Sequence, residues 1–280
     1  MHHPADPYFK GWAKPGPVAP GVQDPSPCEP GVTLDALSGY YRLYQLRQGH
    51  RFSTDDVLTA WYGTSWIPCA RTILDLGSGI GSVGMMAAWR LPGARLVTIE
   101  VQPESVSLAR RSARYNGLED RCEIREGDFR DAAVLRSDES FDLILGSPPY
   151  FPAGSGVLGD HPQKIACRFE LRGSIVDYCQ VAAEHLAAGG WFACVFPTEQ
   201  LSRVEHAARQ AKLAMIRNRP VVFREDEPPL LTLFAFARAA DLPPGFRDRT
   251  WVEPPLIIRT REGHVHPEYS AVKLSVGFPP

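Results

Sequence analysis

Two short stretches of the sequence hold residues whose types and spacing suit the binding of a cofactor and chemistry on a substrate. The first, Thr72 to Gly84, begins with the apolar run Thr-Ile-Leu-Asp-Leu, which is typical of a buried strand. Four glycines follow at alternate or near-alternate positions, and then comes the helical pattern Met85–Arg90. Glycine allows positive φ angles and lets a ligand approach the main chain closely. We therefore expect a strand, a tight turn and a helix N-terminus that together hold a slender ligand.

An acid in this turn separates two kinds of ligand. Gly79-Ile-Gly-Ser-Val-Gly84 matches the G-x-G-x-x-G fingerprint of dinucleotide sites, and Glu100 follows about 20 residues later. A carboxylate at Asp75 would repel a pyrophosphate but would attract an ammonium group. S-adenosylmethionine (SAM) carries an ammonium group and no phosphate, which disfavours a nicotinamide-dependent oxidoreductase. The pattern Asp75-x-Gly77-x-Gly79-x-Gly81 resembles the first motif of class I SAM-dependent methyltransferases.

The second stretch places a catalytic loop after another expected strand. Phe141–Gly146 reads as a buried parallel strand, and Ser147-Pro-Pro-Tyr-Phe151 stands at its carboxyl end. Open α/β sheets bind their ligands at that end of their strands. The loop resembles the (Asn/Asp/Ser)-Pro-Pro-(Tyr/Phe/Trp) motif of methyltransferases that modify an amino nitrogen.

The loop suits a weakly nucleophilic amine. The lone pair of an exocyclic amine is delocalised into its ring, and the Ser147 hydroxyl and the Pro148 carbonyl could accept its two hydrogens and free that lone pair. Pro148 and Pro149 stiffen the turn and remove competing N–H donors. Tyr150 would stack on the base, a contact worth about 1–3 kcal/mol in nucleic-acid complexes. Proximity and alignment would then supply most of the catalysis.

Further cofactor contacts are expected at the ends of neighbouring strands. Glu100 could accept both hydrogens of a ribose diol, although an acid there can also be an ordinary solvated residue. The resemblance implies that Asp128 and Phe129, after the third strand, hold the adenine. An Asp that follows a Gly is also a common turn residue.

A segment before the glycine turn supplies weaker candidates. Arg51-Phe-Ser-Thr-Asp55 lies where related enzymes close over the methionine end of the cofactor. Phe52 and Thr54 are therefore candidate cofactor residues, while Asp55 could be only a helix cap.

From Thr72 onward the pattern alternates strands and helices, which predicts right-handed βαβ units and a parallel sheet. Pro220–Phe223 and Leu230–Ala237 flank a loop too short for a crossover helix, so we expect them to pair antiparallel. The expected fold is α/β and Rossmann-like, as in class I methyltransferases. It has a seven-stranded, mostly parallel sheet with an antiparallel last strand and helices on both faces. Strands are expected at 71–76, 95–100, 122–126, 141–146 and 191–196, and helices at 82–90, 103–116, 175–186 and 199–213.

The chain divides into four expected parts. Residues 1–30 are rich in proline and poor in aliphatics, which predicts a disordered tail. Residues 31–66 form an N-terminal hairpin and helix cap, and residues 67–240 form the SAM-dependent methyltransferase domain. Residues 241–280 form a C-terminal extension packed on that domain.

Composition and charge limit the possible partners. Among 280 residues, 44% are hydrophobic, as in an ordinary globular protein. No apolar run approaches the roughly 20 residues that span a bilayer, so we expect a cytoplasmic protein without a membrane partner. The six cysteines are widely spaced and form no C-x-x-C pair, which argues against a metal site and a disulfide framework. The oligomeric state does not follow from the sequence.

Several stretches together resemble the bacterial tRNA1(Val) adenine N6-methyltransferase family, which methylates an adenine next to the anticodon. The resemblance runs from about Tyr41 to Val276 and implies SAM as cofactor and tRNA as partner. This chain departs from the family by its proline-rich tail and by Ser147, where the family has Asn. A serine hydroxyl accepts a hydrogen bond but can also donate one. The matching stretches are Phe52–Asp56, the glycine turn, Ser147–Phe151, Ala166–Phe169, Leu256–Arg259 and Tyr269.

With a net charge of −2, the protein as a whole does not attract nucleic acid electrostatically, so an RNA partner would need a local basic patch. We predict a SAM-dependent N-methyltransferase that acts on adenine N6 of tRNA or other structured RNA. The alternatives are N5-methylation of a protein glutamine, which uses a similar Pro-Pro-Tyr loop, and a non-catalytic SAM-binding subunit. The candidate patch residues are Lys164, Arg168, Arg172, Arg217, Arg219, Arg224, Arg247, Arg249, Arg259, Arg261 and Lys273.

Overall fold

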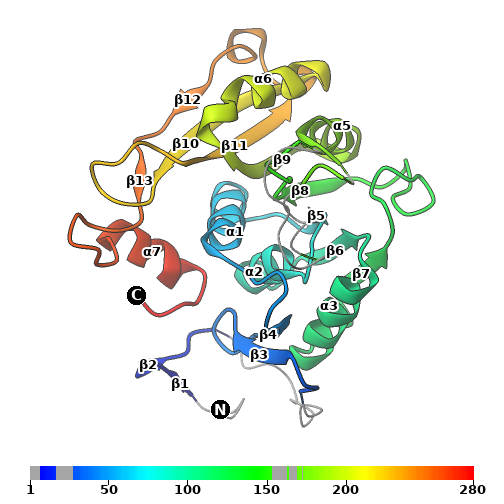
Figure 1. The fold of residues 1–280 in the computed structure, drawn as a ribbon. Coiled ribbons are helices and arrows are strands. Elements are labelled where there is room, and N and C mark those ends of the chain that lie inside the picture. Colours follow the sequence, from blue (N-terminus) through cyan, green and yellow to red (C-terminus); the bar gives the residue numbers. More distant parts are fainter. Residues whose placement is uncertain (1–6, 17–27, 153–162, 164–168, 172) are drawn as a thin grey trace.

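The computed structural model describes residues 7–16, 28–152, 163, 169–171 and 173–280. Within these residues, nine strands form a central sheet in the order β12-β10-β11-β9-β8-β5-β6-β7, and β13 also pairs with β10 (Figure 1). Helices cover both faces of this sheet. The long strands are β5 (Thr72–Leu76), β6 (Arg95–Glu100), β7 (Cys122–Glu126), β8 (Phe141–Gly146), β9 (Leu186–Pro197), β10 (Leu213–Val222) and β11 (Leu231–Arg238).

The strand directions are those of the expected fold. The five strands from β5 to β9 run parallel to one another, and β11 runs antiparallel to both β9 and β10. The predicted Rossmann-like sheet, with seven mostly parallel strands and an antiparallel last strand, is confirmed. The short strands β12 (Trp251–Val252) and β13 (Leu256–Ile257) add to its edge at β10, and they come from the C-terminal extension.

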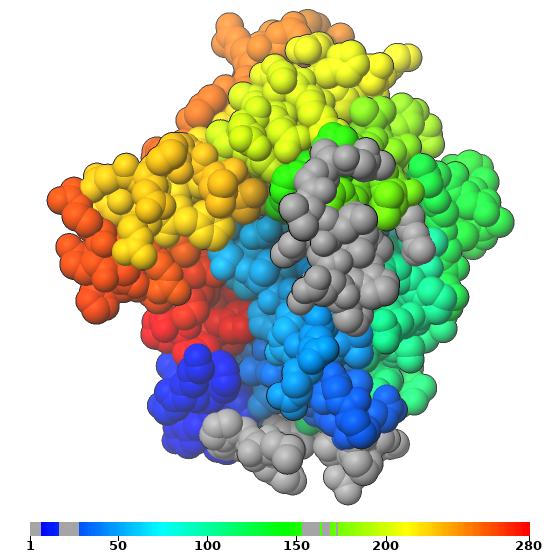
Figure 2. All heavy atoms as spheres, in the orientation of Figure 1, coloured from blue at the N-terminus to red at the C-terminus, as the bar shows by residue number. Residues whose placement is uncertain are grey.

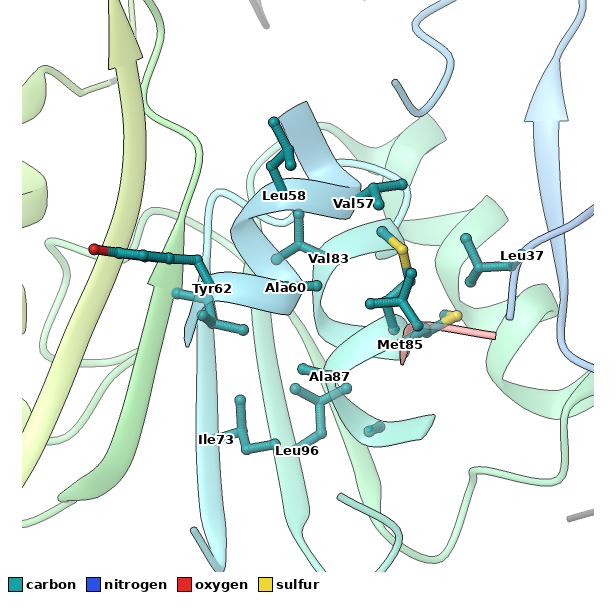
Figure 3. Packing of buried hydrophobic residues seen from close by; sticks show 14 of the residues in the cluster. Leu37, Val57, Leu58, Ala60, Tyr62, Ile73, Val83, Met85, Ala87 and Leu96 are labelled. Atoms are coloured by element: carbon teal, nitrogen blue, oxygen red, sulfur yellow. The ribbon is translucent and has the colours of Figure 1, made fainter. Parts of the chain in front are cut away.

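Two clusters of buried apolar side chains hold the helices to the sheet, one on each face. Figure 3 shows part of the first cluster, where Leu58 lies beside Val83 and, on the sheet, Ile73 lies beside Leu96. The second cluster lies on the opposite face, under α5 and α6. None of the helices in the described part of the chain is long and apolar enough to cross a membrane. The helices are α1 (Thr54–Trp66), α2 (Ser82–Arg90), α3 (Pro103–Tyr115), α5 (Ile175–His185), α6 (Leu201–Gln210) and α7 (Pro267–Ser275).

Some element boundaries differ from the sequence-based expectation. The helix expected over 199–213 is a short 3-10 turn, η1 (Thr198–Gln200), followed by α6, which ends at Gln210. Lys212 has a left-handed φ of 57°, a conformation that a helix cannot continue through. The apolar residues from Leu213 therefore begin β10, where they pair with β11.

The N-terminal region contains two hairpins. The strands β3 (Val32–Ala36) and β4 (Arg42–Leu46) pair antiparallel and form the first hairpin. Residues 7–16 form a second small hairpin from β1 (Tyr8–Phe9) and β2 (Trp12–Ala13), in place of the disordered tail expected for them. It lies beside α7 (Figure 2). Gly16 approaches the Trp89 indole so closely that a Cβ there would clash, and this contact anchors the hairpin. The rest of the expected tail, 1–6 and 17–27, lies outside the described residues.

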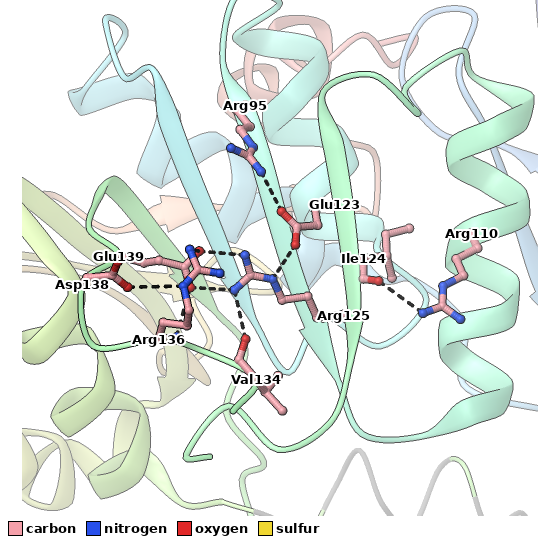
Figure 4. Close-up of polar contacts among 9 residues, drawn as sticks. All are labelled: Arg95, Arg110, Glu123, Ile124, Arg125, Val134, Arg136, Asp138 and Glu139. Carbon is pink, nitrogen blue, oxygen red and sulfur yellow. Dashed lines mark hydrogen bonds and ion pairs between the residues drawn. The ribbon is translucent and has the colours of Figure 1, made fainter. Parts of the chain in front are cut away.

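An ion-pair network fixes the loop between β7 and β8 (Figure 4). Both terminal nitrogens of Arg125, on β7, donate hydrogen bonds to the Glu139 carboxylate, at 2.8 and 2.7 Å. It also donates to the Val134 carbonyl at 2.9 Å. These hydrogen bonds hold the pKa of Glu139 at about 2, so the pair stays ionised at neutral pH. The network thereby holds the loop that carries Asp128 and Phe129.

Candidate active site

A cavity of about 760 Å³ opens at the carboxyl ends of β5, β6 and β8. Its volume is in the range of small-molecule sites, about 300–1,000 Å³. The walls come from the start of α1, the β5–α2 turn, the end of β6, and the loops after β7 and β8. The cavity therefore joins the glycine turn and the Pro-Pro loop, which lie about 70 residues apart in the sequence.

Most of the predicted site residues line this cavity. Phe52, Thr54 and Gly81 are not among the lining residues that the structure describes. Phe52 packs against Phe278, with ring centroids 5.9 Å apart, and Thr54 is the first residue of α1. Gly81 is the N-cap residue of α2. The predicted residues that do line the cavity are Asp75, Gly77, Gly79, Glu100, Asp128, Phe129, Ser147, Pro148, Pro149 and Tyr150.

The glycine turn is shaped by close packing as well as by backbone conformation. Gly77 has a φ of +60°, and a Cβ placed there would lie 2.1 Å from the Tyr178 hydroxyl. Tyr178, on α5, also lines the cavity, and its ring meets the Phe129 ring at a centroid distance of 4.8 Å. The sequence analysis missed Tyr178 because it occupies an ordinary apolar position of an amphipathic helix. Only its approach to Gly77 reveals it.

Asp75 is buried at the base of the turn, with 1% of its surface exposed. Its Oδ2 accepts a hydrogen bond from the Gly84 amide at 2.8 Å. Burial raises the pKa of Asp75 to about 8, because a carboxylate is poorly stabilised away from water. A cationic group beside Asp75 would favour its ionised form, so the site suits an ammonium ligand.

Glu100 presents a carboxylate that the main chain holds in place. Its Oε2 accepts from the Gly79 amide at 2.9 Å, and its Oε1 accepts from the Gln102 amide at 2.8 Å. Each carboxylate oxygen can accept a further hydrogen bond. Glu100 can therefore still bind a diol while it braces the glycine turn.

Asp128 and Phe129 form the wall beyond Glu100. Asp128 accepts three hydrogen bonds from Arg130, one from its backbone amide and two from side-chain nitrogens. These hydrogen bonds lower the pKa of Asp128. It is therefore ionised, with part of its accepting capacity used by Arg130. Phe129 is buried against Tyr178.

Tyr150 of the Pro-Pro loop is anchored to α1. Its hydroxyl donates to Asp55 Oδ2 at 2.7 Å, and its ring meets Phe196 edge-on at a centroid distance of 5.7 Å. Its carbonyl oxygen accepts from Gln200 Nε2 at 3.0 Å. Burial raises the pKa of the Tyr150 hydroxyl well above its ordinary value, so this group keeps its proton at neutral pH.

The helix cap of α1 is made by Asp56, so capping does not account for Asp55. Asp56 Oδ2 accepts from the Ser53 amide at 2.8 Å, which is the capping-box contact. Its other oxygen accepts from the Ser82 hydroxyl at 2.8 Å and links the N-termini of α1 and α2. Asp55 instead faces the cavity and the Tyr150 hydroxyl.

Several of the candidate patch residues that the structure describes are paired with acids. Arg217 is buried, pairs with Glu253 at 2.9 Å and stacks on Trp66. Arg219 and Arg261 also pair with acids, Glu268 and Asp226. Among the described residues, the basic side chains that line the cavity are Arg47, His50 and Arg51, none of which was a candidate for the patch, and Arg51 pairs with Asp35 at 2.9 Å. Lys164, Arg168 and Arg172 lie outside the described residues.

A metal centre has no support in the part of the chain that the structure covers. No group of three or more His, Cys, Asp or Glu side chains there could hold a metal ion.

Comparison with known proteins connects the fold and the cavity to a family. Residues 65–202 match the family model of the methyltransferase small domain. A tRNA1(Val) (adenine(37)-N6)-methyltransferase from Porphyromonas gingivalis is 31% identical over 234 residues, which is 81% of this chain and 88% of that protein. A release factor glutamine methyltransferase from Aliivibrio fischeri is 29% identical over 146 residues, 50% of each protein.

A solved structure supports the fold. A protein from Agrobacterium tumefaciens, described as a predicted O-methyltransferase, superposes with a TM-score of 0.60 at 20% identity. The match covers 80% of this chain and 98% of that one. At this level of identity the likeness concerns the fold alone.

A Rossmann-like sheet of this order, with an acid at the end of the strand before its glycine turn and a matching domain family, defines the class as SAM-dependent methyltransferases. Within that class, the chain belongs to the tRNA1(Val) (adenine(37)-N6)-methyltransferase family. The family and the enzyme class predicted from the motifs, a SAM-dependent N-methyltransferase, are confirmed by this membership. The roles of the individual cavity residues stay predictions.

Proposed function

We propose that this enzyme transfers the methyl group of SAM to N6 of an adenine in tRNA. The observation that carries the proposal is that Asp75, the glycine turn that follows it and the Ser147–Tyr150 loop line one cavity. A methyl donor on the turn and an amine at the loop would then meet in one enclosed space. Proximity and alignment of two reactants are the main source of catalysis in such a transfer.

The cofactor half of the cavity has groups that fit SAM. The buried Asp75 would bind the ammonium group, and the braced Glu100 would accept from the ribose diol. Phe129 would pack on the adenine, with the Asp128 carboxylate near its amino group. When bound, SAM supplies an electrophilic methyl group.

The target half has groups that fit an aromatic amine. The Ser147 hydroxyl and the Pro148 carbonyl would accept the two hydrogens of the amine and direct its lone pair towards the methyl group. Tyr150, with its hydroxyl tied to Asp55, would offer a fixed ring for stacking. No side chain has to remove the proton before transfer, since the nitrogen becomes acidic once it carries the methyl group.

Two observations favour RNA over protein glutamine as the acceptor. The tRNA-modifying relative matches over 88% of its length, whereas the glutamine methyltransferase matches over 50%. In addition, Arg47 and His50 give the cavity basic side chains that would suit the phosphates flanking a target base, whereas Arg51 pairs with Asp35 at 2.9 Å.

Transfer of labelled methyl from SAM to separate tRNA, rRNA and protein fractions tests the proposal. Each labelled fraction would be digested to nucleosides or amino acids and analysed. The proposal predicts N6-methyladenosine in tRNA. Label recovered as methylglutamine in protein, or in RNA as another methylated nucleoside, would refute it. Measurable SAM binding without transfer to any fraction would favour the non-catalytic subunit.

A further inference from the structure

We propose that Arg203, on α6, is a positioning residue that fixes the Ser147–Tyr150 loop from outside the cavity. Arg203 is not among the described residues that line the cavity. It would therefore act on the target amine only through the side chains and the main chain that it holds. The inference rests on the proposed function, because it concerns how the loop receives the amine.

The helix α6 gives Arg203 a fixed place beside the loop. The buried residues of this helix belong to the second apolar cluster and hold it against the sheet; they are Val204, Ala207 and Ala208. Arg203 precedes Val204 and keeps 34% of its side chain exposed. Its guanidinium contacts three residues that in turn touch the segment Tyr150–Phe151, namely Gln200, Glu170 and Phe196.

The first contact orients a side-chain amide. Arg203 Nη1 donates to Gln200 Oε1 at 2.5 Å, and Gln200 Nε2 donates to the Tyr150 carbonyl at 3.0 Å. A guanidinium can only donate hydrogen bonds, so it selects the oxygen end of the Gln200 carboxamide. The NH2 end is then the one that faces the Tyr150 carbonyl. Arg203 thereby makes Gln200 a donor to the main chain of the loop.

The second contact reaches the residue that follows Tyr150. Arg203 Nη2 donates to Glu170 Oε1 at 2.5 Å, and the Glu170 amide donates to the Phe151 carbonyl at 2.8 Å. Only 11% of the Glu170 side chain is exposed, so its carboxylate needs the guanidinium as a partner. Two successive carbonyls, those of Tyr150 and Phe151, are thus held by residues that Arg203 contacts.

The third contact concerns the Tyr150 ring. The Arg203 guanidinium carbon lies 5.7 Å from the centre of the Phe196 ring, within range of a cation–π interaction. Phe196 is fully buried and meets the Tyr150 ring edge-on at a centroid distance of 5.7 Å. Arg203 therefore supports the ring of Tyr150 through Phe196 as well as the main chain through Gln200.

These anchors matter because the loop before them is stiff. The rings of Pro148 and Pro149 fix their φ angles, so the place of the Pro148 carbonyl and of the Tyr150 ring depends on where the following main chain is held. A misplacement of about 1 Å between reacting groups can cost about 100-fold in rate. Loss of Arg203 should therefore slow methyl transfer, while the cofactor contacts of Asp75 and Glu100 with the glycine turn stay intact.

Arg203→Met tests the proposal on the full chain, since methionine keeps an unbranched side chain and removes the guanidinium. We expect kcat on tRNA to fall about 10- to 100-fold. SAM affinity, measured by calorimetry, should change less than about twofold, and the KM for tRNA less than about threefold. Arg209→Met is the matched control, because Arg209 is an exposed arginine in the last turn of the same helix. It should keep the wild-type kcat.

Two further variants separate positioning from stability, which thermal unfolding reports for each protein. Arg203→Lys keeps a positive charge beside Glu170 but lacks the planar fork that reaches two acceptors. It should lose less stability than Arg203→Met and still show a reduced kcat. Gln200→Glu keeps an acceptor for Arg203 but places an oxygen against the Tyr150 carbonyl, so kcat should fall about tenfold or more. If Arg203→Met does not fold, Gln200→Glu decides.

Three results would overturn the inference. These are a wild-type kcat in either Arg203→Met or Gln200→Glu, an equal loss of kcat in Arg209→Met, and a loss carried only by the KM for tRNA and its salt dependence. The last result would make Arg203 a phosphate contact.

Failure of the proposed function would look different, because the wild type itself would then form no N6-methyladenosine. The variants would in that case be compared on whichever amine the wild type methylates, and the ratios of kcat would still decide. A wild type that methylates no amine would refute both the proposed function and this inference.

Discussion

The two halves of the cavity are built in different ways. In the cofactor half, Asp75 contacts the amide 9 residues later in the chain, and Glu100 contacts an amide 21 residues before it. Both contacts lie within one strand–turn–helix–strand unit. In the target half, Tyr150 meets Asp55 across 95 residues and Gln200 across 50. That half exists only where α1, the Pro-Pro loop and the start of α6 converge.

This difference separates what each half does. The proposed cofactor half relies on main-chain amides that adjacent parallel strands bring together, so we expect it to bind its ligand without the target loop. The target half relies on side chains from distant elements, so single substitutions there should remove transfer and leave cofactor binding intact. The two kinds of defect should therefore be separable by experiment.

The largest expected effect is on the target side. Tyr150→Ala removes the stacking ring and leaves Asp55 without its donor, so kcat/KM on tRNA should fall about 10³-fold or more. SAM affinity, measured by calorimetry on the same sample, should stay within about twofold of the wild type. A Tyr150→Ala enzyme with near-normal transfer would remove the basis for assigning this half to the substrate.

Substitutions on the cofactor side are expected to have a smaller effect, and to weaken SAM binding itself. Asp75→Asn and Glu100→Ala each remove a charged acceptor and should weaken SAM binding about 10- to 100-fold. Glu126→Ala is the matched control, because Glu126 also ends a strand but does not line the described cavity. Wild-type affinity in both cavity variants, or an equal loss in Glu126→Ala, would contradict the assignment.

The pH dependence of SAM binding also tests whether Asp75 binds the ammonium group of SAM. Because the pKa of Asp75 is raised to about 8 by burial, the acid is largely protonated at lower pH and must lose its proton to bind an ammonium group. SAM affinity should therefore rise with pH up to about 8, by at most about tenfold per pH unit. Above that point it should fall, since free α-amino groups lose their own proton at about 7.7–8.0. In Asp75→Asn the rising part should disappear; its persistence there would assign the titration to another group.

The smallest expected effect concerns the basic side chains of the cavity and depends on the proposed RNA substrate. Arg47→Ala should weaken tRNA binding about three- to tenfold. It should also reduce the slope of log binding constant against log salt concentration by about one, the value for one lost phosphate contact. SAM binding should not change. Arg114→Ala, an exposed arginine of α3 paired with Glu119, serves as the control. Equal effects of the two substitutions on tRNA binding would show that Arg47 acts only through overall charge.

The same contrast explains what could be predicted from the sequence. The strand–turn–helix unit around Asp75 and the strand before Ser147 have local signatures, namely apolar runs, glycines and a Pro-Pro pair. These signatures were enough to predict the parallel sheet, its antiparallel last strand and the family. Boundaries such as the start of β10 at Leu213 depend on a left-handed residue and on pairing with a later strand, which local patterns do not encode.

The parts that the sequence could not supply are contacts between distant segments. The spacing Ser53-x-x-Asp56 fits a capping box, but no local pattern shows that Asp55 binds Tyr150. Tyr178 resembles any buried tyrosine of a helix until Gly77 is seen against its hydroxyl. Residues 7–16 are a similar case, since their hairpin is held by Trp89, far along the chain.

A crystal structure of the enzyme with S-adenosylhomocysteine bound tests the central claim most directly. This product keeps the amino group, the ribose diol and the sulfur of SAM. The account predicts the amino group at the Asp75 carboxylate, the diol at Glu100, and the sulfur facing Ser147 and Pro148 across the cavity. A ligand whose sulfur faces away from the Ser147–Tyr150 loop, or whose amino group lies far from Asp75, would contradict it.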